Sequence, residues 1–167
     1  MTPLIPLPEA KKFGPYELTH QFTHSGNLGD SYLATQRGVE GFEKILFIKQ
    51  IYEGYSLDER FAELFIERAS EAVKLHHANI AQVLDLGRAD SRYFLTTEFV
   101  SGMNLQTVIE VSRRLGKNVP HGLVVLVAIE ALKALDYAHR RKDSQLRPLD
   151  FCHGGLAPSD LMLSWDG

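Results

Sequence analysis

The sequence predicts an α+β fold, in which an antiparallel sheet that carries one helix is followed by a mostly helical region. Strand-like segments in the first hundred residues are separated by short turns, most of them containing glycine, and one amphipathic segment interrupts them. After Gly102 the apolar residues recur at helical spacing instead. Because strands joined by short turns pair antiparallel, we expect a five-stranded antiparallel sheet with a single helix.

Composition narrows the class of protein. The 167 residues are 44% hydrophobic and 23% charged, as in ordinary globular domains, and a net charge of −3 gives no nucleic-acid signal. The single cysteine, Cys152, excludes a disulfide framework and, among apolar neighbours, is expected to be buried. The apolar leader, 1–13, has three prolines and no basic start, and the longest apolar run, 123–129, is shorter than the ~18 residues that span a membrane. We expect a cytoplasmic protein with no membrane or nucleic-acid partner.

The strands are predicted from alternation and turn residues. They are expected at 16–22, 31–36, 44–51, 79–86 and 92–100. In the first of them, His20 breaks the apolar alternation. Ser56 and Glu59 have the spacing of a capping box, in which the serine hydroxyl accepts from the glutamate amide, so we expect the amphipathic helix to begin there and to end near Leu75.

Two helices are predicted in the second part of the chain, at about 104–114 and 120–141. Asn104 caps the first helix, and Pro120 opens the second, which is apolar around most of its circumference. Since a large apolar patch is seldom left in water, we expect a protein partner or a second copy to cover 123–138. The residues expected to make this contact are Leu123, Val127 and Leu135.

Five short motifs occur in a fixed order along the chain. They are Tyr32-Leu33-Ala34 after a glycine turn, Leu46-Phe47-Ile48-Lys49, LHHANI at 75–80, YFLTTEFVSG at 93–102 and FCHGGLAPSDLML at 151–163. In this order the motifs resemble the protein kinase fold, specifically the bacterial branch of eukaryotic-like serine/threonine kinases. The resemblance covers 14–167 and implies a leader at 1–13, a kinase-like N-lobe at 14–101 and the first part of a C-lobe at 102–167.

The resemblance implies a nucleotide site with several altered positions. The residues that match the family's nucleotide-binding positions are Gly26, Gly29, Lys49, Glu98 and Val100. Phe47 replaces the small alanine that lies against adenine in the family, so we expect its ring to block the pocket. Arg68 stands where the family has the glutamate that holds the lysine, and it would repel Lys49. Glu71, one helical turn further on, is a possible substitute partner.

The match to the family's catalytic loop lacks its reactive groups. Gly155 stands at the place of the catalytic aspartate, Ala157 at that of a lysine and Asp160 at that of the metal-binding asparagine. His153 is expected to pack beneath the loop. We expect no metal, with Asp160 a Mg²⁺ ligand only if a nucleotide binds.

The resemblance therefore implies a pseudokinase, which is a catalytically inactive domain that binds proteins or regulates them in bacterial signalling. It also implies no cofactor. One alternative is an atypical serine/threonine kinase, or the ATP-binding portion of a longer kinase chain, using ATP and Mg²⁺. Another is a structural fragment with no function of its own. No D-F-G motif follows the loop in these 167 residues, which favours the pseudokinase interpretation.

Overall fold

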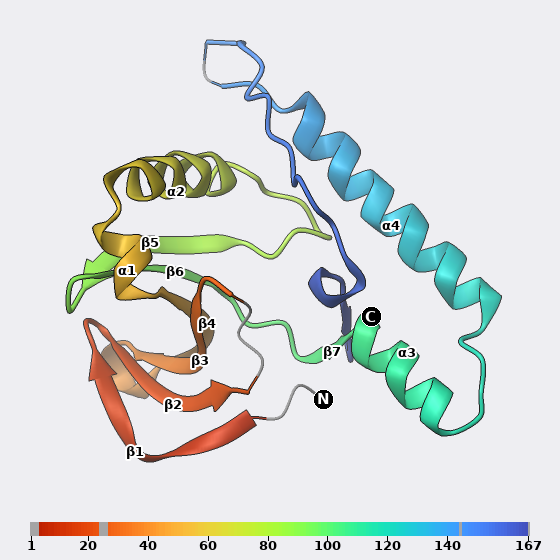
Figure 1. Ribbon diagram of the computed structural model, residues 1–167, viewed down its shortest axis with the longest axis horizontal. Helices are drawn as coiled ribbons and strands as arrows, with labels where there is room; N and C mark the ends of the chain where they lie inside the picture. The colour runs from red at the N-terminus through yellow and green to blue at the C-terminus, as the bar shows by residue number, and fades with distance from the viewer. Residues whose placement is uncertain (1–3, 24–26, 144, 167) are drawn as a thin grey trace. The chain divides into compact units, whose positions relative to one another are not determined.

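The computed structural model describes residues 4–23, 27–143 and 145–166 (Figure 1). These residues divide into two compact units. The first unit contains the described residues up to Lys74 together with Ala81–Phe99. The second contains Leu75–Ile80 and the described residues from Val100 onward. The chain therefore leaves the first unit at Leu75–Ile80 and returns to it to form the last two strands.

In the described residues, six strands of the first unit form one antiparallel sheet with the order β1-β2-β3-β4-β6-β5. The strands are β1 (Leu4–Phe13), β2 (Tyr16–Phe22), β3 (Gly29–Arg37), β4 (Glu43–Ile51), β5 (Val83–Ala89) and β6 (Arg92–Glu98). A short 3₁₀ turn at Val39–Gly41 joins β3 to β4. All the predicted strands are present, so the prediction of an antiparallel sheet is confirmed, but the predicted number of five is wrong.

The additional strand, β1, is the segment that the sequence indicated as a leader. It lies at the edge of the sheet and pairs with β2 alone among the described strands. Proline is tolerated in an edge strand because one side of such a strand needs no amide donor. The pairing is also interrupted between Pro6 and Lys11, where the register shifts. The prolines of this segment are therefore compatible with the strand β1.

The core of the first unit lies on one face of the sheet. Leu46 and Ile48 of β4 are almost completely buried there, and Ala34 of β3 pairs with Leu46. The ring of Phe94 in β6 meets the ring of Phe13 edge to face, with centroids 5.0 Å apart. Burying a side chain of this size stabilises the folded state by about 1.5 to 3 kcal/mol before the loss of chain entropy is subtracted.

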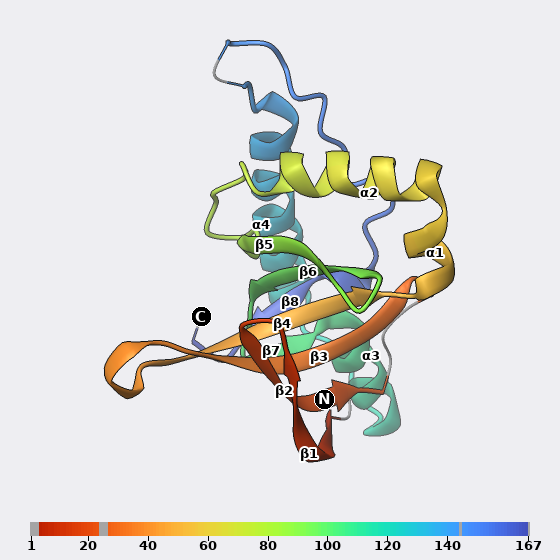
Figure 2. The ribbon, with the colours of Figure 1, turned by 90° about the vertical axis from the view of Figure 1, so that its left-hand side faces the viewer.

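The helices of the first unit are α1 (Glu53–Leu57) and α2 (Glu59–Ala72), and Figure 2 shows α2 running along the sheet beside β5. The predicted capping box is wrong. Asp58 caps α2, because its carboxylate accepts from the amide of Phe61 at 2.9 Å. Ser56 is buried instead, and its hydroxyl accepts from the amide of Tyr93 in β6 at 3.1 Å. The Ser56 hydroxyl, which the sequence predicted to cap the helix, therefore makes a tertiary contact instead.

The second unit contains α3 (Leu105–Arg114), α4 (His121–Arg140) and a pair of three-residue strands, β7 (Gly102–Asn104) and β8 (Met162–Ser164). Both predicted helices are confirmed. Asn104 caps α3 by accepting from the amide of Thr107 at 2.8 Å. Gly102 begins β7, a strand too short for a sequence pattern to reveal. In the described part of the chain, no helix is long and apolar enough to cross a membrane.

The segment Leu75–Ile80 packs against α4. The amide of His76 donates to the hydroxyl of Tyr137 at 3.1 Å, and the ring of His77 lies 5.1 Å from the Tyr137 ring. The side-chain amide of Asn79 donates to the carboxylate of Glu130 at 2.7 Å. These contacts explain why the strand predicted to start at residue 79 starts four residues later, in β5.

Tyr16 gives the first unit a dependence on alkaline pH. Burial, reinforced by the 2.6 Å hydrogen bond that its hydroxyl donates to Asp85, raises the pKa of Tyr16 to about 12. A folded-state pKa above the unfolded value of about 10 means that the contribution to stability is complete below pH 10. It is lost as the pH rises through about 12. In urea unfolding across this range, we expect stability to fall less steeply for Tyr16→Phe than for the wild type. Equal slopes would contradict this role.

The capping contact can be tested in the same unfolding assay. Asp58→Ala should lower the free energy of unfolding by about 1 kcal/mol, because the amide of Phe61 loses its acceptor. Glu59→Ala, the residue of the rejected capping box, is the matched control and should change it by less than about 0.5 kcal/mol. A larger loss for Glu59→Ala than for Asp58→Ala would restore the capping box.

Candidate functional site

The face of the sheet opposite the core carries the candidate nucleotide site. Neighbouring strands pair Ser31 with Lys49, Leu33 with Phe47, and Phe47 with Thr97. Directly paired residues point to the same side of a sheet, so these side chains share one surface. Lys49 also pairs with Leu95 of β6 on this surface. The sequence motif that ends in Lys49 thus alternates between the core and this second face.

Two phenylalanine rings meet on this face. The centroid of Phe47 lies 5.3 Å from that of Phe22 at the end of β2, with the rings tilted by 58°. A bulge makes this contact possible. Leu18 pairs with Ala34, but His20 pairs with Leu33, so β2 holds one extra residue and its side chains change face between the two. The contribution of Phe22 was missed in the sequence, although the break in alternation at His20 marks the bulge.

The side chain of Lys49 is half-buried. Burial lowers the pKa of Lys49, and the negative charge of Asp30 partly opposes this effect. Of the two glycines matched to the phosphate loop, Gly26 lies outside the described residues. Gly29 has a structural reason to be glycine, because a Cβ there would lie 2.0 Å from the backbone oxygen of Gln50 in β4.

The altered ion-pair position lies on α2. The guanidinium of Arg68 contacts the carboxylate of Glu71 at 3.0 Å, with the Arg68 side chain half-exposed and that of Glu71 mostly buried. The glutamate that the sequence indicated as a substitute partner for Lys49 is therefore engaged by the residue that replaced the original one. This pairing offsets the positive charge that Arg68 brings to the helix.

Glu98 is the last residue of β6, and Val100 lies two residues further on. The carboxylate of Glu98 accepts from the amide of Gln82 at 2.8 Å, and its backbone oxygen accepts from the hydroxyl of Thr97 at 3.1 Å. Val100 is half-buried just beyond the strand, in the second unit. The polar groups of Glu98 are thus used within the sheet itself.

The positions of the catalytic loop lie in the second unit, between α4 and β8. Gly155 is exposed, and a Cβ built on it meets no described atom within 4 Å. Gly154 has a φ of 76°, a conformation that favours glycine over the arginine of the family motif. The carboxylate of Asp160 accepts from the amide of Ala157 at 2.9 Å and so closes its own turn, Pro158–Asp160.

Two expectations for this loop are wrong. His153 is exposed and does not pack beneath the loop, because the glycines that follow it offer no side chains to pack against. Cys152 is also exposed, since the residues around it form no strand that would turn it toward a core. In the described residues, no group of three histidine, cysteine, aspartate or glutamate side chains is placed to hold a metal ion.

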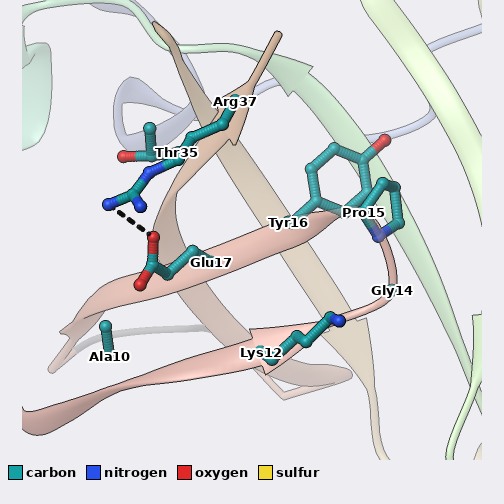
Figure 3. Close-up of a pocket in the computed structure, with 8 residues that line it drawn as sticks. All are labelled: Ala10, Lys12, Gly14, Pro15, Tyr16, Glu17, Thr35 and Arg37. Atoms are coloured by element: carbon teal, nitrogen blue, oxygen red, sulfur yellow. Dashed lines mark ion pairs between the residues drawn. The ribbon is translucent and has the colours of Figure 1, made fainter. Parts of the chain in front are cut away.

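A pocket of about 420 Å³ lies at the far end of the same sheet face, across β1, β2 and β3 (Figure 3). Lys12, Glu17 and Thr35 pair across the three strands along it. Arg37 spans its rim and contacts Glu17 at 3.0 Å and Glu43 at 3.2 Å. These ion pairs satisfy the guanidinium, and the pocket holds none of the positions that the sequence indicated.

The predicted contact residues on α4, Leu123, Val127 and Leu135, are half-buried. The apolar side chains of α4 that are most open to solvent are five other residues of the helix. They are Val124, Val125, Leu126, Ile129 and Leu132. Apolar residues all round a helix could not reveal which side the rest of the unit covers.

Comparison with known proteins finds similar sequences among bacterial protein kinases. No protein-family model matches it. The tyrosine-protein kinase MasK of Myxococcus xanthus is 32% identical over 164 residues, which are 98% of this chain and 25% of MasK. The serine/threonine-protein kinase PknF of Mycobacterium tuberculosis is 26% identical over 160 residues, which are 96% of this chain and 31% of PknF. This chain therefore spans about a quarter to a third of the length of these curated relatives.

Solved structures show a similar fold. The crystal structure of the Mycobacterium tuberculosis PknI kinase domain matches with a TM-score of 0.75 and 22% sequence identity. The match covers 96% of this chain and 59% of that kinase domain. At this level of identity the likeness shows the fold alone, and that fold is protein kinase-like, as the sequence motifs predict.

The contact between Phe47 and Phe22 predicts how the stability of the protein responds to a nucleotide. Phe47→Ala should open space for an adenine ring while destabilising the fold by about 1 to 3 kcal/mol, since the ring is half-buried. With millimolar ATP and Mg²⁺, we expect the melting temperature to rise for the variant and to stay unchanged for the wild type. Ile45→Ala, on the same strand and face, is the control and should not respond. An equal rise for the wild type would show that Phe47 leaves the site open.

Proposed function

Because the chain has a protein kinase-like fold and its homologues are bacterial serine/threonine and tyrosine protein kinases, we propose that it is a pseudokinase domain. In this proposal the chain acts in the cytoplasm as a protein-binding or regulatory module and transfers no phosphate. It needs neither ATP nor a metal ion for that role. The observation that carries the proposal is the glycine at position 155.

The catalytic-loop geometry supports the loss of phosphate transfer. A kinase uses an aspartate at this place to orient the substrate hydroxyl and to accept its proton, and Gly155 has no side chain to do so. A positioned general base contributes about 10²- to 10⁴-fold to a rate. Asp160, the one carboxylate left near the motif's metal position, already accepts from the amide of Ala157. The remaining oxygen donor is thus committed to holding the turn.

The sheet face supports the same proposal independently. Phe47 and Phe22 meet on the face that carries the candidate nucleotide site. In this proposal their contact supplies the packing that a bound base would otherwise supply. The Arg68–Glu71 pair likewise replaces the ion pair that would hold Lys49 in an active kinase. Each change removes a part of the reaction and leaves a contact that stabilises the fold.

The second candidate function is ATP-dependent phosphate transfer, by an atypical kinase or as the ATP-binding portion of a longer kinase chain. The retained Lys49 favours it, because the side chain lies half-buried on the nucleotide face with a lowered pKa. A lysine with no remaining role at such a place could be replaced by an apolar residue without loss. The names of the homologues describe active kinases, which also favours it.

Phosphate transfer from labelled ATP separates the two functions. Purified chain is incubated with ATP, Mg²⁺ and a generic protein substrate, with the PknI kinase domain as the positive control. We expect the wild type to incorporate no more phosphate than Lys49→Ala. Gly155→Asp, which fits without a clash, should also stay inactive because the rings still cover the nucleotide face.

Transfer by the wild type that Lys49→Ala reduces by 100-fold or more would refute the pseudokinase proposal and establish the second candidate. Activity in Gly155→Asp alone would show that the missing aspartate is the single defect. Circular dichroism of each variant must match the wild type, so that a loss of folding is not read as a loss of chemistry.

A further inference from the structure

The bulge in β2 decides which side chain of this strand lies beside Phe47. Thr19 is the extra residue of the bulge, because the pairing with β3 resumes at His20 after the register shift. Side chains alternate along a strand, so one extra residue exchanges the faces of all the side chains that follow it. Phe22 thereby comes to the face of Phe47, with 5.3 Å between the ring centroids.

A continuous register would present the wrong side chain at both faces of the sheet. Without the bulge, Gln21 would lie on the face of Phe47, and Phe22 would lie on the opposite face. In the bulged register, the side-chain amide of Gln21 instead makes a long hydrogen bond of 3.4 Å to the carboxylate of Asp30 on that opposite face. The bulge therefore places ring against ring and amide beside carboxylate at the same time.

The bulge is held by its own side chains. The hydroxyl of Thr19 donates to the backbone oxygen of Leu33 in β3 at 3.2 Å. Because that hydroxyl has a single proton, the hydrogen bond of 3.0 Å between Thr19 and Nδ1 of His20 must be donated by the histidine. Two hydrogen bonds thus run from His20 through Thr19 to β3. The residue that breaks the apolar alternation in the sequence takes part in fixing the bulge.

From these contacts we infer that Thr19 is a positioning residue for the nucleotide face, because its hydroxyl holds the bulge that places the Phe22 ring against Phe47. A shift to the continuous register would break three contacts together, namely the Thr19 hydrogen bond, the Gln21–Asp30 contact and the ring contact. For its meaning at the nucleotide face, this role rests on the proposed function, in which the two rings fill the place of a bound base.

Nuclear magnetic resonance of the aromatic side chains measures the ring contact without a nucleotide. The wild type should show a nuclear Overhauser effect between Phe22 and Phe47. Thr19→Val keeps the shape of the side chain and removes the donor, and the loss of one hydrogen bond shifts an equilibrium by about fivefold. The signal should therefore weaken in Thr19→Val and return in Thr19→Ser. Thr35→Val, the same change on β3 outside the bulge, is the control and should keep the signal.

Deletion of Thr19 separates a role in the bulge from a general role in folding. Once the extra residue is gone, Leu18 and His20 are neighbours, the ladder is continuous, and all later side chains keep their faces. The deletion should therefore retain the ring contact that Thr19→Val weakens. A residue that only stabilised the strand would cause the larger loss when it is deleted. Circular dichroism that matches the wild type shows that each variant is folded.

A double-mutant cycle gives an independent readout. If Thr19 acts through the ring contact, Thr19→Val should raise the unfolding equilibrium constant at least about threefold more in the wild type than in Phe47→Ala. Equal effects in the two backgrounds, an unchanged ring signal in Thr19→Val, or loss of that signal on deletion would overturn the inference. Phosphate transfer by a wild type whose variants behave as expected would refute the pseudokinase proposal alone.

Discussion

The alternation of side chains along β4 is the constraint on which the first unit depends. Leu46 and Ile48 point into the core, and the residues between and after them, Phe47 and Lys49, must therefore point to the other face. A sheet that buries Leu46 and Ile48 on one face therefore presents Phe47 and Lys49 on the opposite face. The bulge in β2 extends the consequence to a neighbouring strand, because it brings Phe22 against Phe47. The core and the face that carries the candidate nucleotide site are thus two sides of one register.

Several residues at or near the positions matched to functional positions of kinases make structural contacts here. Gly29 is required by the approach of the β4 backbone, and the Asp160 carboxylate closes its own turn. Glu71 neutralises Arg68. Each of these polar groups has a partner within its own unit, as polar groups in folded proteins generally do.

The second unit depends on α4 in a similar way. Its inner side holds the segment Leu75–Ile80 through Tyr137 and Glu130, so a piece of chain between α2 and β5 becomes part of this unit. Its other apolar side chains include five that the contacts within the unit leave exposed.

The sequence by itself determined five strands of the large sheet, the helix α2, the helices α3 and α4 with their first residues, and the protein kinase-like fold, because these follow from local periodicity, caps and short motifs. Tertiary structure alone decided the rest. The leader became β1 because an edge strand tolerates proline, and Asp58 replaced Ser56 as the cap because β6 took the serine hydroxyl. Likewise, the face of Phe22, the partner of Arg68 and the exposed side of α4 each depend on residues distant in the chain or on register. Packing between distant segments decides such contacts, and a local sequence pattern does not identify the distant partner.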